Sequence, residues 1–248
     1  MTERKERGIG FNAEMVRAIL READPKTMTR RVVKFGKHGD HDEHHYRSDI
    51  AEKVGKAFPD TRGLALFGCD CDECRGDNTH ECVIRSPYGV PGAVLYVRES
   101  HRLTPFNRDG ERWVCAEYRV GCAVDTRVLE FRWKDIPKAQ RNRLRKIKTW
   151  GRWRPGRFMY KFLARIWLRV TDVRIERVQE IGRDDVLAEG IAQPLYQGHY
   201  GLRDAFAKLW DSINAKRGYG FDTNCWVWVY GLERIAASGW GDDERKST

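Results

Sequence analysis

The sequence lacks several features that define common classes of protein. No apolar run approaches the ~18 residues that a membrane-spanning helix needs, so we do not expect an integral membrane protein. The first residues, MTERKERGIGF, have no apolar signal core, so secretion is not expected either. There is no glycine-rich phosphate loop and no G-x-S-x-G elbow, and no Ser/His/Asp set stands out by its spacing.

The cysteine content and the composition indicate a folded cytoplasmic protein. Seven cysteines, an odd number, without a signal peptide favour a reducing compartment, where clustered thiols are more often metal ligands than disulfides. Although 33% of the 248 residues are charged, nine Trp, nine Tyr and ten Phe can supply a core. A wholly disordered chain is therefore not expected, and the length suggests one large domain with an insertion.

The excess positive charge is concentrated in one segment. Residues 132–157 carry eleven Lys and Arg but a single acid, Asp135, which is the whole formal net charge of +10. Aromatic residues are interleaved with this basic segment or follow it: Trp133, Trp150, Trp153, Phe158 and Tyr160. Cations neutralise phosphates and rings stack on unpaired bases, so the composition favours binding to single-stranded or flipped-out nucleic acid. The alternative is a solvated basic helix and loop that keeps the protein soluble.

The nucleic-acid hypothesis assigns binding to specific side chains. We expect a basic arm over residues 120–158. Within it the predicted contacts are Arg141, Arg143, Arg145, Lys146, Lys148, Trp150, Arg152, Trp153 and Arg154. Arginine outnumbers lysine, and its planar fork can bind phosphate or stack on a base.

Local patterns predict an α+β fold. We expect helices over 12–21, 183–189 and 202–213, with Asn12 as an N-cap and Gly190 as a stop. Strands are expected over 26–33, 94–99, 111–118 and 226–235, and one long or two consecutive strands over 163–178. Such strands with peripheral helices suggest a small mixed β-barrel. The prediction is one domain over 1–236 with an insertion at 34–92, followed by a disordered tail over 237–248.

The insertion contains a candidate zinc knuckle over residues 69–82. Cys71 and Cys74 have the C-x2-C spacing that lets two thiolates reach one tetrahedral ion, and Cys69, Cys82 and His80 can supply the others. We expect a structural zinc ion, since four protein ligands leave no position for water; reduced free thiols are the alternative. We expect the histidines at 38, 41, 44 and 45 to lie in a solvated loop. We expect Cys115, Cys122 and Cys225 to be small side chains of the core.

A dispersed set of residues could support catalysis. Lys26 and Thr29 lie three apart at the start of a predicted strand, and Glu99 ends another. A lysine near a hydroxyl and a carboxylate could activate a nucleophile or hydrogen-bond a base edge. On spacing alone, a surface ion pair is the default interpretation.

Blocks along most of the chain resemble phage- and prophage-encoded ASCH-domain proteins in family order. They are residues 11–20 (FNAEMVRAIL), 26–31 (KTMTRR), 87–92 (PYGVPG), 95–99 (LYVRE), 170–181 (VTDVRIERVQEI), 185–191 (DVLAEGI), 209–214 (LWDSIN) and 226–229 (WVWV). The resemblance implies a PUA-like barrel with a helix beside a cleft, and a role in binding RNA or a modified base in a bacterial host cytoplasm.

The resemblance also implies roles for individual residues. Small relatives that hydrolyse the amide of N4-acetylcytidine use a Lys, a Thr three residues later and a downstream Glu. By position, Lys26 would be the base or activator, Thr29 the nucleophile and Glu99 the proton shuttle. Arg30, Arg31 and Arg98 would line the cleft that receives a base.

Three functions therefore follow as expectations. The first is a nucleic-acid-binding protein whose partner is RNA, single-stranded DNA or a modified nucleoside. The second is an enzyme, either an amidohydrolase on modified cytidine or a ribonuclease. The third is a non-catalytic phage morphogenesis or accessory factor, in which the basic arm contacts another protein.

Overall fold

The computed structural model describes residues 6–34, 46–47, 64–69, 81–119, 129–191 and 199–235, and the side chains of most of them. The chain divides into two compact units. The first unit comprises Met1–Arg4, Glu22–Ala93 and Arg169–Glu233, and the second comprises Lys5–Arg21, Val94–Leu168 and Arg234–Thr248.

In its described residues, the first unit combines a sheet with two helices. Its main strands are β2 (Met28–Val32), β11 (Trp167–Arg177, entering from the second unit) and β12 (Trp226–Ile235), in the order β11-β12-β2, and β12 and β2 pair antiparallel. A separate sheet contains β3 (Tyr46–Arg47), β4 (Leu64–Cys69) and β5 (Glu81–Arg85). The helices are α4 (Arg183–Ala188) and α5 (His199–Asn214).

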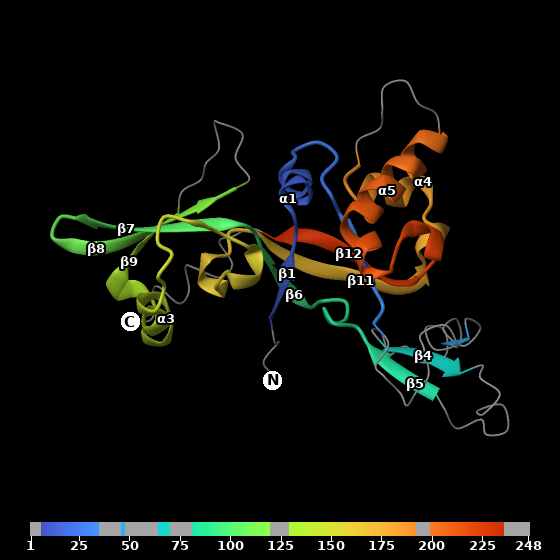
Figure 1. Cartoon of the computed structure of the whole chain (residues 1–248), viewed down its shortest axis with the longest axis horizontal. Helices are drawn as coiled ribbons and strands as arrows, with labels where there is room; N and C mark the ends of the chain where they lie inside the picture. The colour runs from blue at the N-terminus through green and yellow to red at the C-terminus, as the bar shows by residue number, and fades with distance from the viewer. Residues whose placement is uncertain are drawn as a thin grey trace. The chain divides into compact units, whose positions relative to one another are not determined.

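The core of the first unit lies between the helices and β12. Phe206 and Trp210, one helical turn apart in α5, are buried together with Val186 of α4 and with Val227 and Val229 of the strand. Figure 1 shows α4 and α5 beside one another next to β12. Burying two aromatic side chains stabilises the unit by roughly 2 kcal/mol each or more, so α5 is held by its apolar face.

The described part of the second unit contains two sets of strands and two helices. Strand β1 (Arg7–Gly10) pairs parallel with β6 (Val94–Arg98), and α1 (Ala13–Leu20) follows β1. An antiparallel sheet has the order β10-β7-β8-β9. Its strands are β7 (His101–Arg108), β8 (Glu111–Tyr118), β9 (Leu129–Arg132) and β10 (Trp153–Arg154), and α3 (Lys138–Arg145) lies between the last two in sequence.

The two faces of the antiparallel sheet differ in character. Val114, Ala116 and Tyr118 of β8 alternate with half-buried residues and form a core with Leu144 of α3 and with Leu163. The opposite face carries Phe106, Trp113 and Arg132, which stand directly across the strands from one another. One face of the sheet is therefore core, and the other is a half-exposed surface of rings and charges.

The α+β class is confirmed by these elements. The predicted N-cap is also confirmed, since the Asn12 side chain accepts a hydrogen bond from the Met15 amide at 2.8 Å. Strands β8 and β12 have the predicted bounds, and the one or two strands predicted over 163–178 are one strand, β11, which follows a 3-10 turn (Lys161–Leu163). None of the sheets in the described ranges closes into a barrel, so that part of the fold stays a prediction.

Candidate nucleic-acid interface

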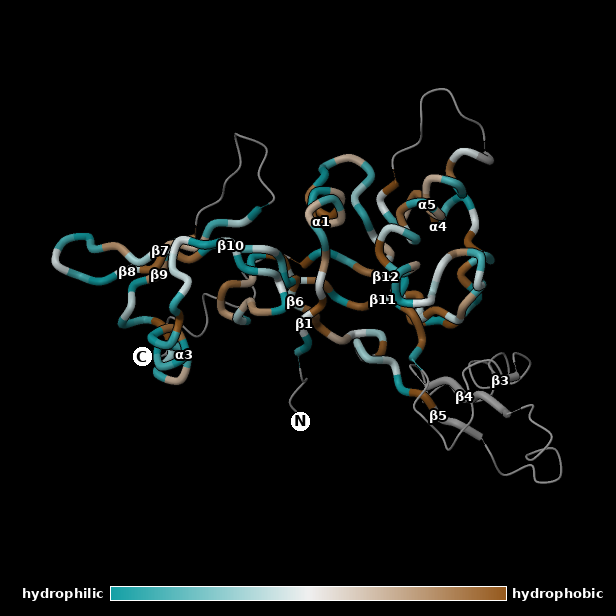
Figure 2. The backbone as a smooth tube through the Cα atoms, in the orientation of Figure 1, coloured by the Kyte–Doolittle hydropathy of each residue, from teal (hydrophilic) through white to brown (hydrophobic). Residues whose placement is uncertain are grey.

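The basic segment lies entirely in the second unit. After β9, a 3-10 turn (Trp133–Asp135) leads into α3, where Leu144 is the one buried side chain. The remaining positions of the helix are polar, and Figure 2 shows hydrophilic residues along α3. A helix with so few apolar residues is held to the core by a single anchor and leaves its cations on the surface.

Most cations of the segment have no acidic partner among the residues that the structure describes. Arg132 lies 4.0 Å from Asp135, and Lys134 pairs with Glu111. Within the described part of the chain, the other nine form no ion pair: Lys138, Arg141, Arg143, Arg145, Lys146, Lys148, Arg152, Arg154 and Arg157. Because neighbouring like charges repel one another, a surface with nine unneutralised cations favours a polyanionic partner. We call these nine residues the cationic face.

Two large rings of the segment are exposed, and one of them stands beside these cations. Phe158 is 48% exposed, and the guanidiniums of Arg154 and Arg157 lie 5.9 and 4.8 Å from its ring centre. Trp153 is 42% exposed but stands across the strand pair from Arg102, on the other face of the sheet from Arg154, and Arg102 is bound by Glu117. Phe158 can therefore stack on an unpaired base while the cations next to it bind the adjoining phosphates.

The half-exposed face of the sheet carries a second set of rings that the sequence analysis did not single out. Phe106 and Trp113 stack at 6.2 Å with an angle of 25°, and Arg108 lies 5.2 Å from both ring centres. Here, however, the charges are neutralised internally, since Arg108 binds Glu130 through both guanidinium nitrogens at 2.7 and 3.1 Å. The cationic face, rather than this one, is therefore the candidate interface.

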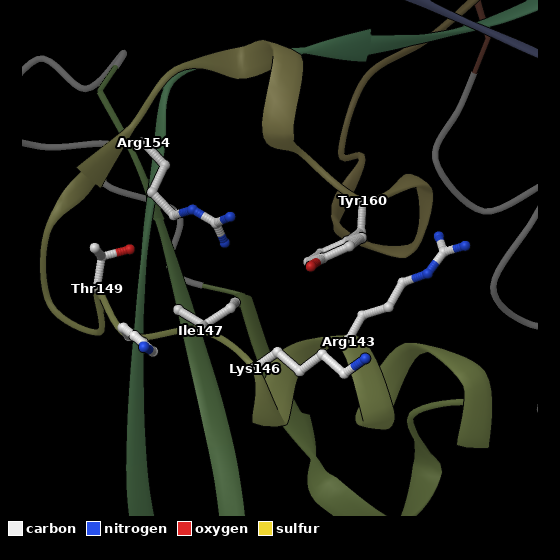
Figure 3. Close-up of a pocket in the computed structure, with 7 residues that line it drawn as sticks. Arg143, Lys146, Ile147, Thr149, Arg154 and Tyr160 are labelled. Atoms are coloured by element: carbon white, nitrogen blue, oxygen red, sulfur yellow. The ribbon is translucent and has the colours of Figure 1, made fainter.

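A pocket of about 420 Å³ opens within the cationic face. Its walls carry four cations and no acid: Arg143, Lys146, Lys148 and Arg154, together with Ile147, Thr149 and Tyr160. In Figure 3 the Arg154 guanidinium and the Tyr160 hydroxyl point toward one another across the pocket, while Arg143 and Lys146 border it from the end of α3. Four cations without an acid in its lining match an anionic ligand.

Arg154 is incompletely satisfied inside this pocket. Its Nη1 atom is buried and has no hydrogen-bond partner in the described residues. Across the strand pair, Arg154 stands opposite His101, whose Nδ1 lies 3.2 Å from the Glu99 carbonyl oxygen. A buried guanidinium nitrogen without an acceptor costs roughly 1–3 kcal/mol, which an anion in the pocket could recover.

The buried imidazole of His101 predicts a pH dependence of stability. Burial lowers the pKa of His101 from 6.5; the hydrogen bond to the Glu99 backbone opposes this shift, and the charge of Arg154 adds a smaller lowering effect. Because the native pKa is depressed, the stabilisation is present above pH 6.5 and is lost as pH falls through the native value, by at most about 1.4 kcal/mol per pH unit. Urea unfolding between about pH 7.5 and pH 5.5 should therefore show a smaller loss for His101→Leu than for the native protein. Equal losses of unfolding free energy in the variant and the native protein would contradict a contribution from His101.

Lys26 and Thr29 lie in the first unit, both buried. The Lys26 ammonium donates to the Glu189 carbonyl oxygen at 2.7 Å and also pairs with the Glu189 carboxylate. Burial lowers the pKa of Lys26, against the opposing effect of Glu189. The Thr29 hydroxyl is buried and finds no hydrogen-bond partner among the described residues.

Arg30 is the centre of a buried ion network in the first unit. Its Nη2 lies 2.5 Å from Glu176 and 2.6 Å from Asp185, and its Nη1 lies 3.4 Å from Glu189. Arg174 binds the first two of these carboxylates as well, at 3.1 and 2.7 Å. Arg30 is thus occupied inside the unit and does not join the interface. The neighbouring Arg31 is half-buried on the same strand.

Glu99 lies in the second unit and is also buried. Arg165 donates to both of its carboxylate oxygens at 2.9 Å, so the acid is fully paired. The neighbouring Arg98 is half-buried at the end of β6, and Trp150 is half-buried and packs against the core of the second unit. The partner of Lys26 in the structure is Glu189, and the partner of Glu99 is Arg165.

The predicted metal ligands lie outside the described side chains. Cys69 and Cys82 fall on β4 and β5, whose side chains at those positions are not described, and Cys71, Cys74 and His80 lie outside the described residues. The zinc site therefore stays a prediction. In the described residues, no group of three or more His, Cys, Asp and Glu side chains is arranged to hold a metal ion.

Comparison with family models, with curated proteins and with solved structures found no match to this chain. Over the residues that the structure describes, no helix has the length and apolar character needed to cross a membrane.

Proposed function

We propose that this protein binds single-stranded nucleic acid through the cationic face, as a member of the ASCH family with a PUA-like fold. The observation that carries the proposal is the set of nine cations without an acidic partner in the described residues, with the exposed ring of Phe158 beside two of them, Arg154 and Arg157. Cations alone would suit any polyanion. An exposed ring beside them adds a surface on which an unpaired base can stack, which a duplex does not offer.

The salt dependence of binding tests this function. Affinity of the whole chain for a fluorescent oligonucleotide, RNA or DNA, should fall steeply with salt, because each neutralised phosphate of a single strand contributes about −0.7 to the slope of log K against log salt. Binding through five or so of the nine cations predicts a slope of about −3 to −4. A duplex of the same length should bind more weakly, since its bases are not free to stack.

A triple substitution and a matched control locate the interface. Changing Arg141, Arg143 and Arg145 to Gln should make the slope less steep by about 2 and weaken binding at least tenfold. Changing Lys208, Lys216 and Arg217 to Gln removes the same charge from exposed positions of the first unit and should have little effect. Equal weakening by both triples would assign binding to net charge and refute the cationic face.

A hydrolase is the second candidate, and one pair of observations favours it. Lys26 is a buried lysine with a lowered pKa, and the nearby strand position holds a threonine whose hydroxyl has no partner in the described residues. A buried lysine with a lowered pKa and a hydroxyl without a partner in the described residues are the residue types from which an activated nucleophile is built. The pair is buried, however, and Lys26 is engaged by Glu189, so nucleic-acid binding remains the conclusion.

A further inference from the structure

The pocket within the cationic face has more positive charge than one internal phosphate of a nucleic-acid strand would need for neutralisation. Four cations line it without an acid, and none of the four forms an ion pair in the described part of the chain. A phosphodiester within a strand carries one negative charge. A terminal phosphomonoester carries about −1.5 to −2 at neutral pH and three strong acceptor oxygens, and therefore matches such a site better.

The number of acceptor atoms points the same way. A terminal phosphomonoester has three free oxygens for the four cations of the pocket, whereas an internal phosphodiester has two. The Nη1 atom of Arg154 is buried without an acceptor, and the guanidinium points into the pocket (Figure 3). A phosphate oxygen there would supply the missing acceptor as a charge-assisted hydrogen bond.

The surroundings of Arg154 offer a place for the adjoining nucleoside. The exposed ring of Phe158 lies 5.9 Å from the Arg154 guanidinium carbon, which places a stacking surface beside the phosphate position. Tyr160 is stacked on Phe162 at 5.9 Å with an angle of 17°, and this contact fixes its ring while its hydroxyl faces the pocket. The arrangement combines a phosphate site with an adjacent base platform.

From this geometry we infer that the pocket binds the terminal phosphomonoester of a nucleic-acid strand, with Arg154 at its centre and the terminal base on Phe158. The inference rests on the proposed function and deepens it, because the protein would bind the phosphorylated ends of strands in preference to unphosphorylated ends. A 5′-phosphate and a 3′-phosphate share the required chemistry.

The test compares strand ends on one oligonucleotide. An internally labelled single strand of roughly ten nucleotides is prepared with a 5′-phosphate, with a 3′-phosphate and with neither, and its affinity for the whole chain is measured by anisotropy. At least one phosphorylated form should bind about tenfold more tightly than the unphosphorylated form, as expected for a hydrogen bond to a charged group. The form that gains identifies the end that is read.

Two variants separate the pocket from the rest of the face. Arg154→Gln should lose most of the preference for the phosphorylated end, and Arg152→Gln, an exposed neighbour outside the pocket, should weaken all forms by the same factor and keep the preference. If Arg154→Gln does not fold, the double change of Lys146 and Lys148 to Gln serves in its place, since both side chains are exposed.

The outcomes distinguish the two proposals. Equal affinity of the native protein for all three forms overturns the pocket inference and leaves nucleic-acid binding intact. A preference that survives both pocket variants overturns it as well. If no form binds at all, the proposed function fails and the inference fails with it.

Discussion

Replacing Arg30 with methionine is expected to lower the free energy of unfolding of the first unit by about 3–5 kcal/mol, the cost of removing one partner from a buried ion network. The Arg30 side chain is 1% exposed and lies within 3.4 Å of three carboxylates, on Glu176, Asp185 and Glu189. Methionine fills similar space without the charge. The three carboxylates would then remain close together with less positive charge to neutralise them. Arg174 and Lys26 neutralise only part of that charge.

An exposed ion pair in the same unit provides the control. Arg169 binds Glu233 at 2.9 Å with both side chains about half exposed, so Arg169→Met should cost less than about 1 kcal/mol. Urea unfolding followed by circular dichroism gives the free energies, and amide exchange in β2 and β12 assigns the loss to the first unit. Similar costs for the two substitutions would mean that the network around Arg30 is not what stabilises this unit.

Elements with strong local signals could be predicted from the sequence. Asn12 precedes an apolar pattern with helical spacing, and its side chain caps α1 as that pattern indicates. Strand β8 alternates between buried and half-buried residues, and β12 is a run of aromatic and β-branched residues, so both were located with their observed bounds. These signals lie within a few residues of one another along the chain.

The elements that were missed depend on distant partners. Strand β7 contains Pro105 and several polar residues, which read as a loop, but its pairing with β8 over all eight positions makes it a strand. Helix α3 is too polar to be found by its periodicity, and Leu144 alone connects it to the core. In both cases tertiary contacts decide the structure, and sequence spacing does not contain them.

The charge of the candidate interface could be predicted from the sequence, but the ion-pair partners of Lys26 and Glu99 could not. The concentration of cations over 132–157 is visible in the sequence, and the structure leaves nine of them without an acid in its described part. By contrast, Lys26 and its partner Glu189 are separated by 163 positions, and Glu99 and Arg165 by 66. No spacing rule links such pairs, so a reading of Lys26, Thr29 and Glu99 from the sequence could not anticipate their actual neighbours.

Those neighbours lead to the second large effect, a loss of stability in Glu99→Gln. Arg165 is 9% exposed and donates two hydrogen bonds of 2.9 Å to a carboxylate that is 1% exposed. Glutamine retains one acceptor oxygen but brings an amide N–H₂ against the guanidinium and removes the carboxylate charge that two of the guanidinium nitrogens contact. We expect a loss of about 3 kcal/mol in the free energy of unfolding, measured by urea denaturation.

The double variant Glu99→Met with Arg165→Met separates a structural from a catalytic role for Glu99. Replacing both partners of a buried pair by apolar residues is often nearly neutral, so this variant should be more stable than Glu99→Gln. Glu130→Gln, which removes the exposed partner of Arg108, should cost less than about 1 kcal/mol. A Glu99 retained only as a proton shuttle would instead leave stability unchanged in Glu99→Gln, because the pairing with Arg165 would then contribute nothing to the fold.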